Sequence, residues 1–290
     1  MSEEVEVEEK KSHKFLNFII FLILLAVFIV LYSMYMGTKG LIVKEYRVES
    51  NVLTENFSGI KIIHFSDLLY KSTVDSEEVE RVINRINLLK PDIVVFTGNL
   101  FTNGIKPANK DIDFLTKQLS KIKTTLGKYA IYGEYDYDQN IYDDIMNNSG
   151  FKILSNSYDE IFNDNNDNIY IVGLASTLKD SVDLTTAFDF YNEEERKYII
   201  VLVHEGAAIK YIDESDYEVD LILGGYSLNG SVVLPFLGGI FVPEGSYKYS
   251  EPYYQKGITN IYISSGIGTK NPRARLNNKP SFNLYRLKAQ

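Results

Sequence analysis

Short apolar segments that each end in a polar side chain are the feature that most constrains the fold of this chain. Apolar runs of this length, rich in β-branched residues, are typical of buried strands. In open α/β sheets, ligands bind beyond the carboxyl ends of the strands. We therefore expect one functional edge, formed by the residues that follow these runs: Asp67 after 61–65, Asn99 after 92–96, Glu134 after 129–132 and His204 after 199–203. A fifth run, 220–223, ends in a glycine-framed turn.

The segments between these runs carry helical apolar stripes. Helices are predicted over 76–90, 111–123, 138–148 and 183–196, and further strands over 41–48, 151–154, 169–174, 261–264 and 282–287. Strand–helix alternation is typical of an α/β fold. The larger share of strands in the second half indicates a mixed sheet or two packed sheets. With 290 residues available, we expect residues 44–290 to form a single domain.

Composition excludes some classes of function. The net charge of −9 argues against nucleic acid as a partner, because phosphate backbones require a basic patch. The chain has no cysteine, which excludes disulfides and thiolate metal sites.

Residues 15–36 are almost wholly apolar and predict a transmembrane helix, because about 20 apolar residues span a bilayer core. A buried core helix is rarely apolar on all sides for so long. A cleaved signal peptide is disfavoured because the run exceeds the usual apolar region and lacks a small-x-small cleavage site. A short charged tail, 1–14, precedes this segment, and a linker, 37–43, follows it.

Basic residues flank the apolar segment on both sides. Those before it form the tighter cluster (Lys10, Lys11, His13, Lys14), whereas those after it are spread out (Lys39, Lys44, Arg47). Because positive charge is retained in the cytoplasm, we expect a single-pass protein of the cell membrane with an extracytoplasmic C-terminal domain.

The residues at the strand ends form a series of motifs in a fixed order. They are Ser66-Asp67-Leu68, Gly98-Asn99-Leu100, Gly133-Glu134-Tyr135-Asp136, Val203-His204-Glu205 and Gly225-Tyr226-Ser227-Leu228. This series resembles the five blocks of the calcineurin-like metallophosphoesterase superfamily, in particular its bacterial membrane-associated branch. The resemblance extends from about Glu45 to Leu287. It implies a four-layer α/β/β/α sandwich with a two-metal site that hydrolyses phosphoesters.

Several positions depart from the family blocks, which read D-x-H, G-D, G-N-H-D, a late His and G-H-x-H. Carried over by position, the resemblance implies that Asp67, Asn99, Glu134 and His204 are the residual metal ligands, with Asn99 in place of the bridging Asp and Glu134 in place of an Asn. Three ligand positions are lost, since Leu69, Tyr226 and Leu228 stand where the family has His, and Tyr135 stands at the catalytic His.

These departures favour structural roles for the remaining polar groups. We expect Asp67 to be a hydrogen-bonding carboxylate and Glu134 to form an ion pair with His204. Bulky side chains at 135, 226 and 228 are expected to fill the former metal site. Arg273 and Arg275 follow a glycine-rich turn and are candidates for anion binding, with a surface role as the alternative.

Three functions are consistent with the sequence. The first is a catalytically inactive or strongly impaired phosphoesterase that acts as a binding or scaffold module, for which no metal cofactor is expected. The second is a residual phosphodiesterase or phosphatase that uses one divalent cation (Mn, Zn, Fe or Mg) on a membrane or envelope phosphoester. The third is a sugar- or lipid-binding module with Tyr135 and Tyr226 as an aromatic floor. The membrane is the one partner that the sequence indicates, and it identifies no protein or envelope ligand.

Overall fold

Two six-stranded sheets form the centre of the computed structural model, which describes residues 13–137, 140–163 and 167–290. The first sheet has the order β1-β14-β2-β3-β4-β5. Its strands are β1 (Ile42–Ser50), β14 (Ser281–Ala289), β2 (Lys61–Phe65), β3 (Ile93–Phe96), β4 (Gly127–Ala130) and β5 (Lys152–Ile153). Strand β14 runs antiparallel to β2, and β2 to β5 are parallel to one another.

The second sheet has the order β12-β13-β9-β8-β7-β6. Its strands are β12 (Tyr253–Lys256), β13 (Thr259–Ile263), β9 (Leu221–Gly224), β8 (Ile199–Val203), β7 (Asp167–Gly173) and β6 (Ser157–Asn163). The four central strands are parallel, and both edge strands are antiparallel to their neighbours. A separate short ladder joins β10 (Val233–Leu234) to β11 (Gly238–Gly239).

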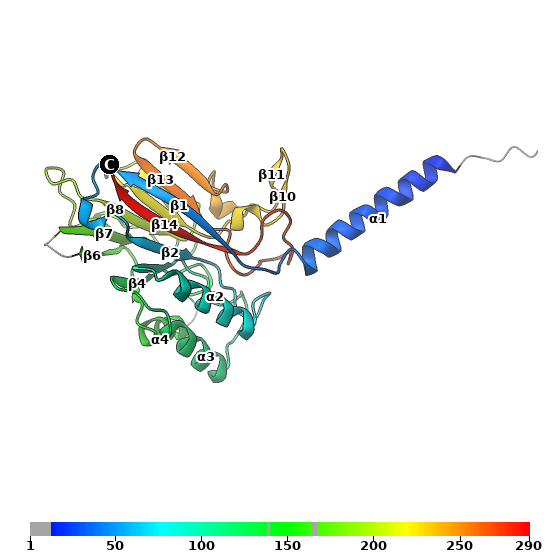
Figure 1. Cartoon of the computed structure of the whole chain (residues 1–290), viewed down its shortest axis with the longest axis horizontal. Helices are drawn as coiled ribbons and strands as arrows, with labels where there is room; N and C mark the ends of the chain where they lie inside the picture. Colours follow the sequence, from blue (N-terminus) through cyan, green and yellow to red (C-terminus); the bar gives the residue numbers. More distant parts are fainter. Residues whose placement is uncertain (1–12, 138–139, 164–166) are drawn as a thin grey trace, which may run out of the picture.

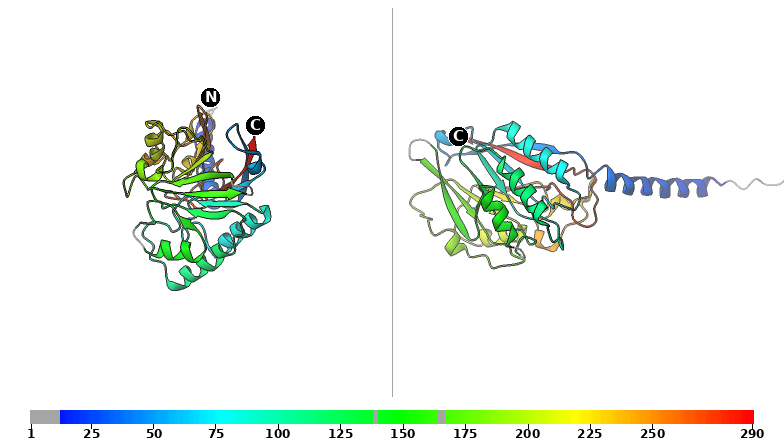
Figure 2. Two further views of the ribbon diagram at one scale, coloured as in Figure 1. Left: turned by 90° about the vertical axis from the view of Figure 1, so that its left-hand side faces the viewer. Right: turned by 90° about the horizontal axis from the view of Figure 1, so that it is seen from below.

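Helices cover both outer faces, which gives four layers (Figures 1 and 2). The first sheet is covered by α2 (Ser76–Leu89), α3 (Asn109–Ser120) and α4 (Ile141–Asn148), and the second by the short α5 (Leu184–Ala187) and α6 (Ile209–Asp213). Single 3₁₀ turns occur at Glu55–Phe57, Gly206–Ala208, Leu228–Gly230 and Glu244–Ser246. The expected α/β/β/α sandwich is confirmed.

Successive side chains along a strand point to opposite faces of the sheet, so each strand packs against the layer on either side. In β2, Ile62 faces the core between the sheets, whereas Ile63 faces the α2–α4 layer. In β8, Leu202 faces the core between the sheets and Val201 faces α5 and α6. Strands buried on both faces are continuous apolar runs, which is why the sequence pattern identified them.

Some expected elements differ from the structure. The helix expected over 183–196 is limited to α5, because the aromatic residues that follow it pack against the sheet instead, and Phe190 stacks on Tyr170 with 3.8 Å between ring centroids. Strands β6, β10, β11 and β12 were not predicted. The expected charged tail lies outside the described residues except for positions 13 and 14, and so does Asp138, the expected first residue of the third helix.

Helix α1 (Lys14–Tyr35) extends away from the sandwich (Figure 1). Only Ser33 is buried within this helix, which the structure describes completely. It is long and apolar enough to cross a membrane. The C-terminal end of α1 touches the domain: the backbone N–H of Arg275 donates to the carbonyl of Ser33 at 2.9 Å. Strand β1 begins at Ile42, inside the segment expected as a linker.

Candidate functional site

The carboxyl ends of parallel strands from both sheets meet at one edge of the sandwich, as the sequence predicted. Asp67 follows β2, Asn99 follows β3, Glu134 follows β4 and His204 follows β8. Five residues in these turns and in the turn after β9 have positive φ angles: Asp67 (49°), Leu69 (47°), Asn99 (63°), Tyr226 (65°) and Leu228 (52°). Such conformations cost about 1 kcal/mol or more for residues other than glycine and cluster at functional sites. The backbone at this edge is therefore demanding at several positions whose side chains differ from the family pattern.

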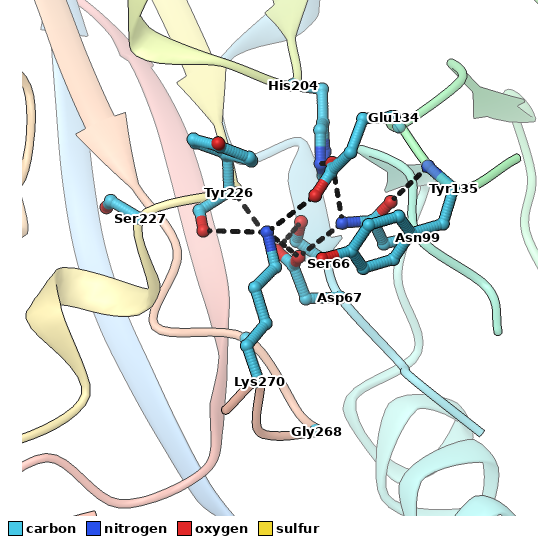
Figure 3. Close-up of polar contacts among 12 residues, drawn as sticks. Ser66, Asp67, Asn99, Glu134, Tyr135, His204, Tyr226, Ser227, Gly268 and Lys270 are labelled. Carbon is cyan, nitrogen blue, oxygen red and sulfur yellow. Dashed lines mark hydrogen bonds and ion pairs between the residues drawn. The ribbon is translucent and has the colours of Figure 1, made fainter. Parts of the chain in front are cut away.

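The amide of Asn99 lies between two carboxylates (Figure 3). Its Nδ2 donates to Asp67 Oδ1 at 3.0 Å and to Glu134 Oε2 at 2.9 Å, while its Oδ1 accepts the N–H of Tyr135 at 3.1 Å. Because carboxylates only accept hydrogen bonds, the amide nitrogen must face them. Asn99 therefore presents N–H groups, not a ligand oxygen, to its two neighbours.

Asp67 is fully buried. Besides an ion pair with Lys270, it accepts three hydrogen bonds. Its Oδ2 accepts the hydroxyl of Ser66 at 2.7 Å and the N–H of Tyr226 at 3.0 Å, and its Oδ1 accepts from Asn99. These contacts agree with the expected hydrogen-bonding carboxylate. Through these contacts Asp67 joins the turn after β9 to the turns after β2 and β3.

Glu134 and His204 form the expected buried ion pair, with 2.7 Å between Oε2 and Nε2. The other ring nitrogen of His204 contacts the carbonyl of Thr97, which can only accept, so Nδ1 carries a proton. Burial alone would lower the pKa of His204, but the hydrogen bond and the negative charge of Glu134 outweigh it and raise the pKa to about 9. Burial opposes ionisation of Glu134 as well, yet His204 and Lys270 hold the pKa of its carboxyl well below the usual value.

Lys270 supplies a cation at the centre of this group (Figure 3). Its Nζ lies 3.0 Å from Glu134 Oε1, 3.7 Å from Asp67 Oδ1 and 3.2 Å from the carbonyl oxygen of Tyr226. The same ammonium lies 3.9 Å from the centroid of the Tyr226 ring and 5.4 Å from that of Tyr135, within cation–π range. The expectation that bulky side chains fill the former metal site is therefore only half right, because a charged nitrogen with flanking rings occupies its centre.

Leu69 and Leu228 pack beneath the loop that carries Lys270. A Cβ atom on Gly268 would lie 2.5 Å from the Cβ of Leu69, and one on Gly266 would lie 2.4 Å from Cδ2 of Leu228. The two leucines are buried, and the loop backbone approaches them so closely that only glycine fits. Leu69 and Leu228 thus support the loop, and the loop places Lys270 at the site.

Asp136 accepts three backbone N–H groups, from Asn99 at 2.6 Å, Gly133 at 2.8 Å and Leu100 at 2.9 Å. Burial raises the pKa of this carboxyl to about 7 against the effect of these donors. The residue ties together the turns after β3 and β4, which agrees with a role in turn structure.

The two arginines predicted as candidates for anion binding have different environments in the structure. Arg275 is fully buried, and its guanidinium donates to backbone carbonyls, including those of Ser265 at 2.6 Å and Asn278 at 3.2 Å. It stabilises the loop, so the expectation that it binds an anion is wrong for Arg275: its donors are used and no solvent reaches it. Arg273 is exposed and lines a cleft of about 670 Å³ together with Glu134, Tyr135, Tyr226 and Lys270.

These contacts do not suit two divalent cations. Such cations require several oxygen or nitrogen lone pairs around each ion. Here Asn99 turns N–H groups toward both carboxylates, and the positive charges of Lys270 and protonated His204 already face them. For a single cation the donor set is better, because ligand atoms of Glu134, His204 and Glu205 lie within 4.8 Å of one another. Glu205 already accepts the hydroxyl of Ser176 at 2.6 Å and the N–H of Thr177 at 3.0 Å.

Sequence reasoning missed Lys270 and the carboxylate of Glu205. Lys270 follows the Gly266–Gly268 turn at the end of β13, a strand parallel to β9. A basic residue just beyond a strand that ends at the same edge was the signal that could have identified it. Glu205 is adjacent to His204 in the sequence, but its direction depends on the turn into the 3₁₀ segment that follows it.

Comparison with known proteins agrees with this geometry. Residues 60–225 match the model of the calcineurin-like phosphoesterase family. An uncharacterized metallophosphoesterase of Bacillus subtilis, YkuE, is 30% identical over 262 residues, which cover 89% of each chain. One from Aquifex aeolicus is 28% identical over 92% of this chain and 98% of its own. A Danio rerio transmembrane protein with a metallophosphoesterase domain is 25% identical over 90% of this chain and 60% of its own. The chain belongs to the calcineurin-like phosphoesterase family.

Proposed function

We propose that this chain is a membrane-anchored binding module on a phosphoesterase fold, inactive or strongly impaired as a hydrolase. The observation that carries the proposal is the contact of the Lys270 ammonium with Glu134 at 3.0 Å and Asp67 at 3.7 Å. An internal cation at this point balances carboxylates that would otherwise need bound metal. It holds the site together without an exchangeable ion.

A lysine ammonium in the place of bound metal also leaves the site without the groups that carry out hydrolysis. Two-metal phosphoesterases generate a hydroxide nucleophile on the metals and stabilise the phosphoryl oxygens with them. An ammonium only donates hydrogen bonds and binds no hydroxide as a ligand. Tyr135 stands where the family has the His that protonates the leaving oxygen, and burial raises the pKa of its phenol far above 10. A phenol that holds its proton so firmly is a poor general acid near neutral pH.

The cleft beside Lys270 is the surface through which a ligand would bind. Arg273 lines it and, among the residues that the structure describes, has no carboxylate within ion-pair distance. Its charge is therefore available to an anionic group, while the half-buried ring of Tyr135 offers an apolar contact beside it. These features favour a small ligand with an anionic group and a ring or chain, such as a phosphorylated sugar or a lipid headgroup.

Helix α1 supports the membrane part of the proposal. Its apolar side chains are exposed along nearly the whole length, and they need a nonpolar environment. The similarity to a transmembrane protein from Danio rerio agrees with this assignment. From the distribution of basic residues on either side of the helix, we infer that the domain lies outside the cytoplasm.

Metal content and turnover of the full chain in detergent test this function. After incubation with Mn²⁺, Zn²⁺, Fe²⁺ or Mg²⁺ and removal of free ions, we expect far less than one bound ion per chain. Hydrolysis of bis(p-nitrophenyl) phosphate with Mn²⁺ should not exceed that of the His204→Ala variant. Metal-dependent hydrolysis that disappears in His204→Ala would contradict the proposal.

A residual one-cation hydrolase is the second candidate, and the cluster of Glu134, His204 and Glu205 is the observation that favours it. In that case one divalent ion binds per chain, and both ion and turnover are lost in Glu205→Gln. Glu251→Gln is the matched control, because Glu251 is exposed and is not among the cluster residues. Equal ion content in the wild type and Glu205→Gln would exclude this site.

A further inference from the structure

The segment around β10 and β11 exposes a continuous set of apolar side chains. Residues 231–243 contain no charged side chain. Phe236 is 107% exposed and Leu237 75% exposed, and they are followed by Ile240, Phe241 and Val242, each exposed by 39% or more. Contiguous exposed apolar patches of this kind usually mark sites of contact with a membrane or another protein.

The conformation of Phe236 adds a second observation. Its φ angle is 68°, in the left-handed region that favours glycine or asparagine. A large aromatic residue at a fully exposed turn of this type gains no packing within the domain. Its side chain therefore contributes nothing to folding that would offset the backbone strain.

This hairpin lies at the end of the domain from which α1 emerges (Figure 1). The hairpin and the end of α1 are both hydrogen-bonded to one short segment, residues 275–277. Val233 donates its N–H to the carbonyl of Leu276 at 2.9 Å, and Asn277 Nδ2 donates to the carbonyl of Val233 at 3.0 Å. The preceding residue, Arg275, donates its N–H to the carbonyl of Ser33 in α1. The base of the hairpin and the C-terminal end of α1 are thus held next to the same segment, at the same end of the domain.

We propose that the hairpin tip, Phe236 and Leu237, inserts into the same lipid bilayer that α1 crosses, an inference that rests on the membrane anchorage proposed above. The 22 residues of α1 extend over roughly 33 Å at about 1.5 Å per residue, close to the bilayer core of about 30 Å. The C-terminal end of α1 then lies at the boundary between headgroups and acyl chains. A hairpin fixed at that level meets the boundary with its uncharged, aromatic tip, as amphipathic membrane-surface elements do.

The insertion has a consequence for the cleft. Ile240, Phe241 and Val242 follow β11 and line one side of the cleft that contains Lys270 and Arg273. With the hairpin tip in the lipid, this wall stands at the headgroup layer. The cleft then opens toward lipid headgroups, and a ligand reaches it from the membrane surface.

Tryptophan fluorescence in vesicles tests the insertion, because the chain has no tryptophan of its own. The full chain carrying Phe236→Trp is reconstituted into phosphatidylcholine–phosphatidylglycerol vesicles with and without brominated acyl chains. Phe28→Trp in α1 reports on the anchor, and Phe162→Trp in β6 is the matched control. Phe162 is 56% exposed, and β6 lies at the end of the domain opposite to α1 (Figure 1). We expect brominated lipid to quench Phe236→Trp about two-fold or more, as it does Phe28→Trp, and to leave Phe162→Trp unchanged.

Each other outcome overturns the inference in a recognisable way. If Phe28→Trp is quenched but Phe236→Trp behaves like Phe162→Trp, the hairpin is outside the bilayer while the anchor stands. Blue-shifted emission of Phe236→Trp without quenching means that the tip is buried against protein, such as a second copy of this chain. If Phe28→Trp is not quenched, the proposed anchorage fails, and the insertion fails with it.

Discussion

The ammonium of Lys270 lies 3.0 Å from a carboxylate oxygen of Glu134, and Glu134 in turn lies 2.7 Å from the imidazole of His204. One carboxylate is therefore held between two nitrogen groups on separate loops, where the family pattern implies metal ions. The charge that balances Asp67 and Glu134 is covalently attached to the chain. Lys270 thus brings a positive charge to both carboxylates from within the chain.

Removal of the Lys270 charge should destabilise the domain. In Lys270→Met the apolar stem is retained, but Asp67, which is fully buried, loses its cation and Glu134 keeps only its ion pair with His204. Leaving a buried charge without its partner costs about 3–5 kcal/mol, and the 15% exposure of the Lys270 side chain brings the expected loss to roughly 2–4 kcal/mol. Chemical denaturation of the full chain in detergent, followed by circular dichroism, measures this loss. Lys256→Met is the control: its ion pair with Asp213 is 2.7 Å long but half exposed, so we expect a loss below about 1 kcal/mol. Equal losses in the two variants would contradict the role assigned to Lys270.

Metal binding should appear when the internal cation is removed and the bridging carboxylate is restored. In the double variant Asn99→Asp/Lys270→Ala, three carboxylates face one another, and their repulsion is relieved by divalent cations. We expect Mn²⁺ to bind at least about tenfold more tightly than to the wild type and to raise the melting temperature. Isothermal titration with Mn²⁺ measures the affinity, with Lys256→Ala as the control. Unchanged Mn²⁺ affinity would show that Lys270 does not substitute for a metal.

Stability should fall as the pH rises above about 6.5. The pKa of His204 is raised from 6.5 to about 9, so its contribution is complete below pH 6.5 and is lost as the pH rises through about 9. Below pH 6.5 two buried groups act in opposite directions. Burial lowers the pKa of His64 to about 3, so protonation there favours the unfolded chain, whereas burial raises the pKa of Asp136 to about 7, so protonation there favours the folded one. Melting temperatures of the full chain between pH 7 and pH 10 check the alkaline limb. In His204→Gln this limb should flatten, and an unchanged limb would contradict the assigned ion pair.

A methyl group at Gly37 should separate the end of α1 from the domain. A Cβ atom there would lie 1.8 Å from the carbonyl oxygen of Arg275, so Gly37→Ala forces the two segments apart. We expect faster tryptic cleavage at Lys39, with a melting temperature of the domain close to that of the wild type. Gly40→Asn is the matched control, since a Cβ there meets nothing within 4 Å and asparagine tolerates its φ of 86°. Wild-type cleavage rates in Gly37→Ala would mean that the contact with Arg275 is dispensable.

The sequence pattern was sufficient for the α/β class and for the edge at which the site lies, and the resemblance to the family implied the four layers. Buried strands such as β2 and β8 are continuous apolar runs, and each is followed by the polar residue that reaches the site, Asp67 or His204. The Glu134–His204 pair was expected from the resemblance to the family blocks, which implies that both residues lie at one site. In contrast, α5 is shorter than its apolar pattern indicates, because Phe188 and Phe190 gain more by packing against the aromatic residues of the sheet and its loops.

The position of Lys270 could not be predicted, because it depends on two close approaches of the chain in three dimensions. Gly266 and Gly268 bring the loop against Leu69 and Leu228, and Arg275 fixes the loop by donating to its carbonyls. The contacts of the two glycines with the two leucines join residues that are distant in the sequence. From the sequence alone, Leu69 and Leu228 indicate only that ligands are lost, not that they support the loop that carries the new cation.

The hydrogen bond between Arg275 and Ser33 leaves very little slack between helix and domain. With β1 starting at Ile42, the linker between α1 and the domain is too short to act as a long tether. With α1 in a membrane as proposed above, the encounters of the site would be confined to a thin layer above the lipid and to molecules that diffuse laterally within it. A domain mounted in this way gains a high local concentration of membrane-bound ligands and gives up access to most of the surrounding solution.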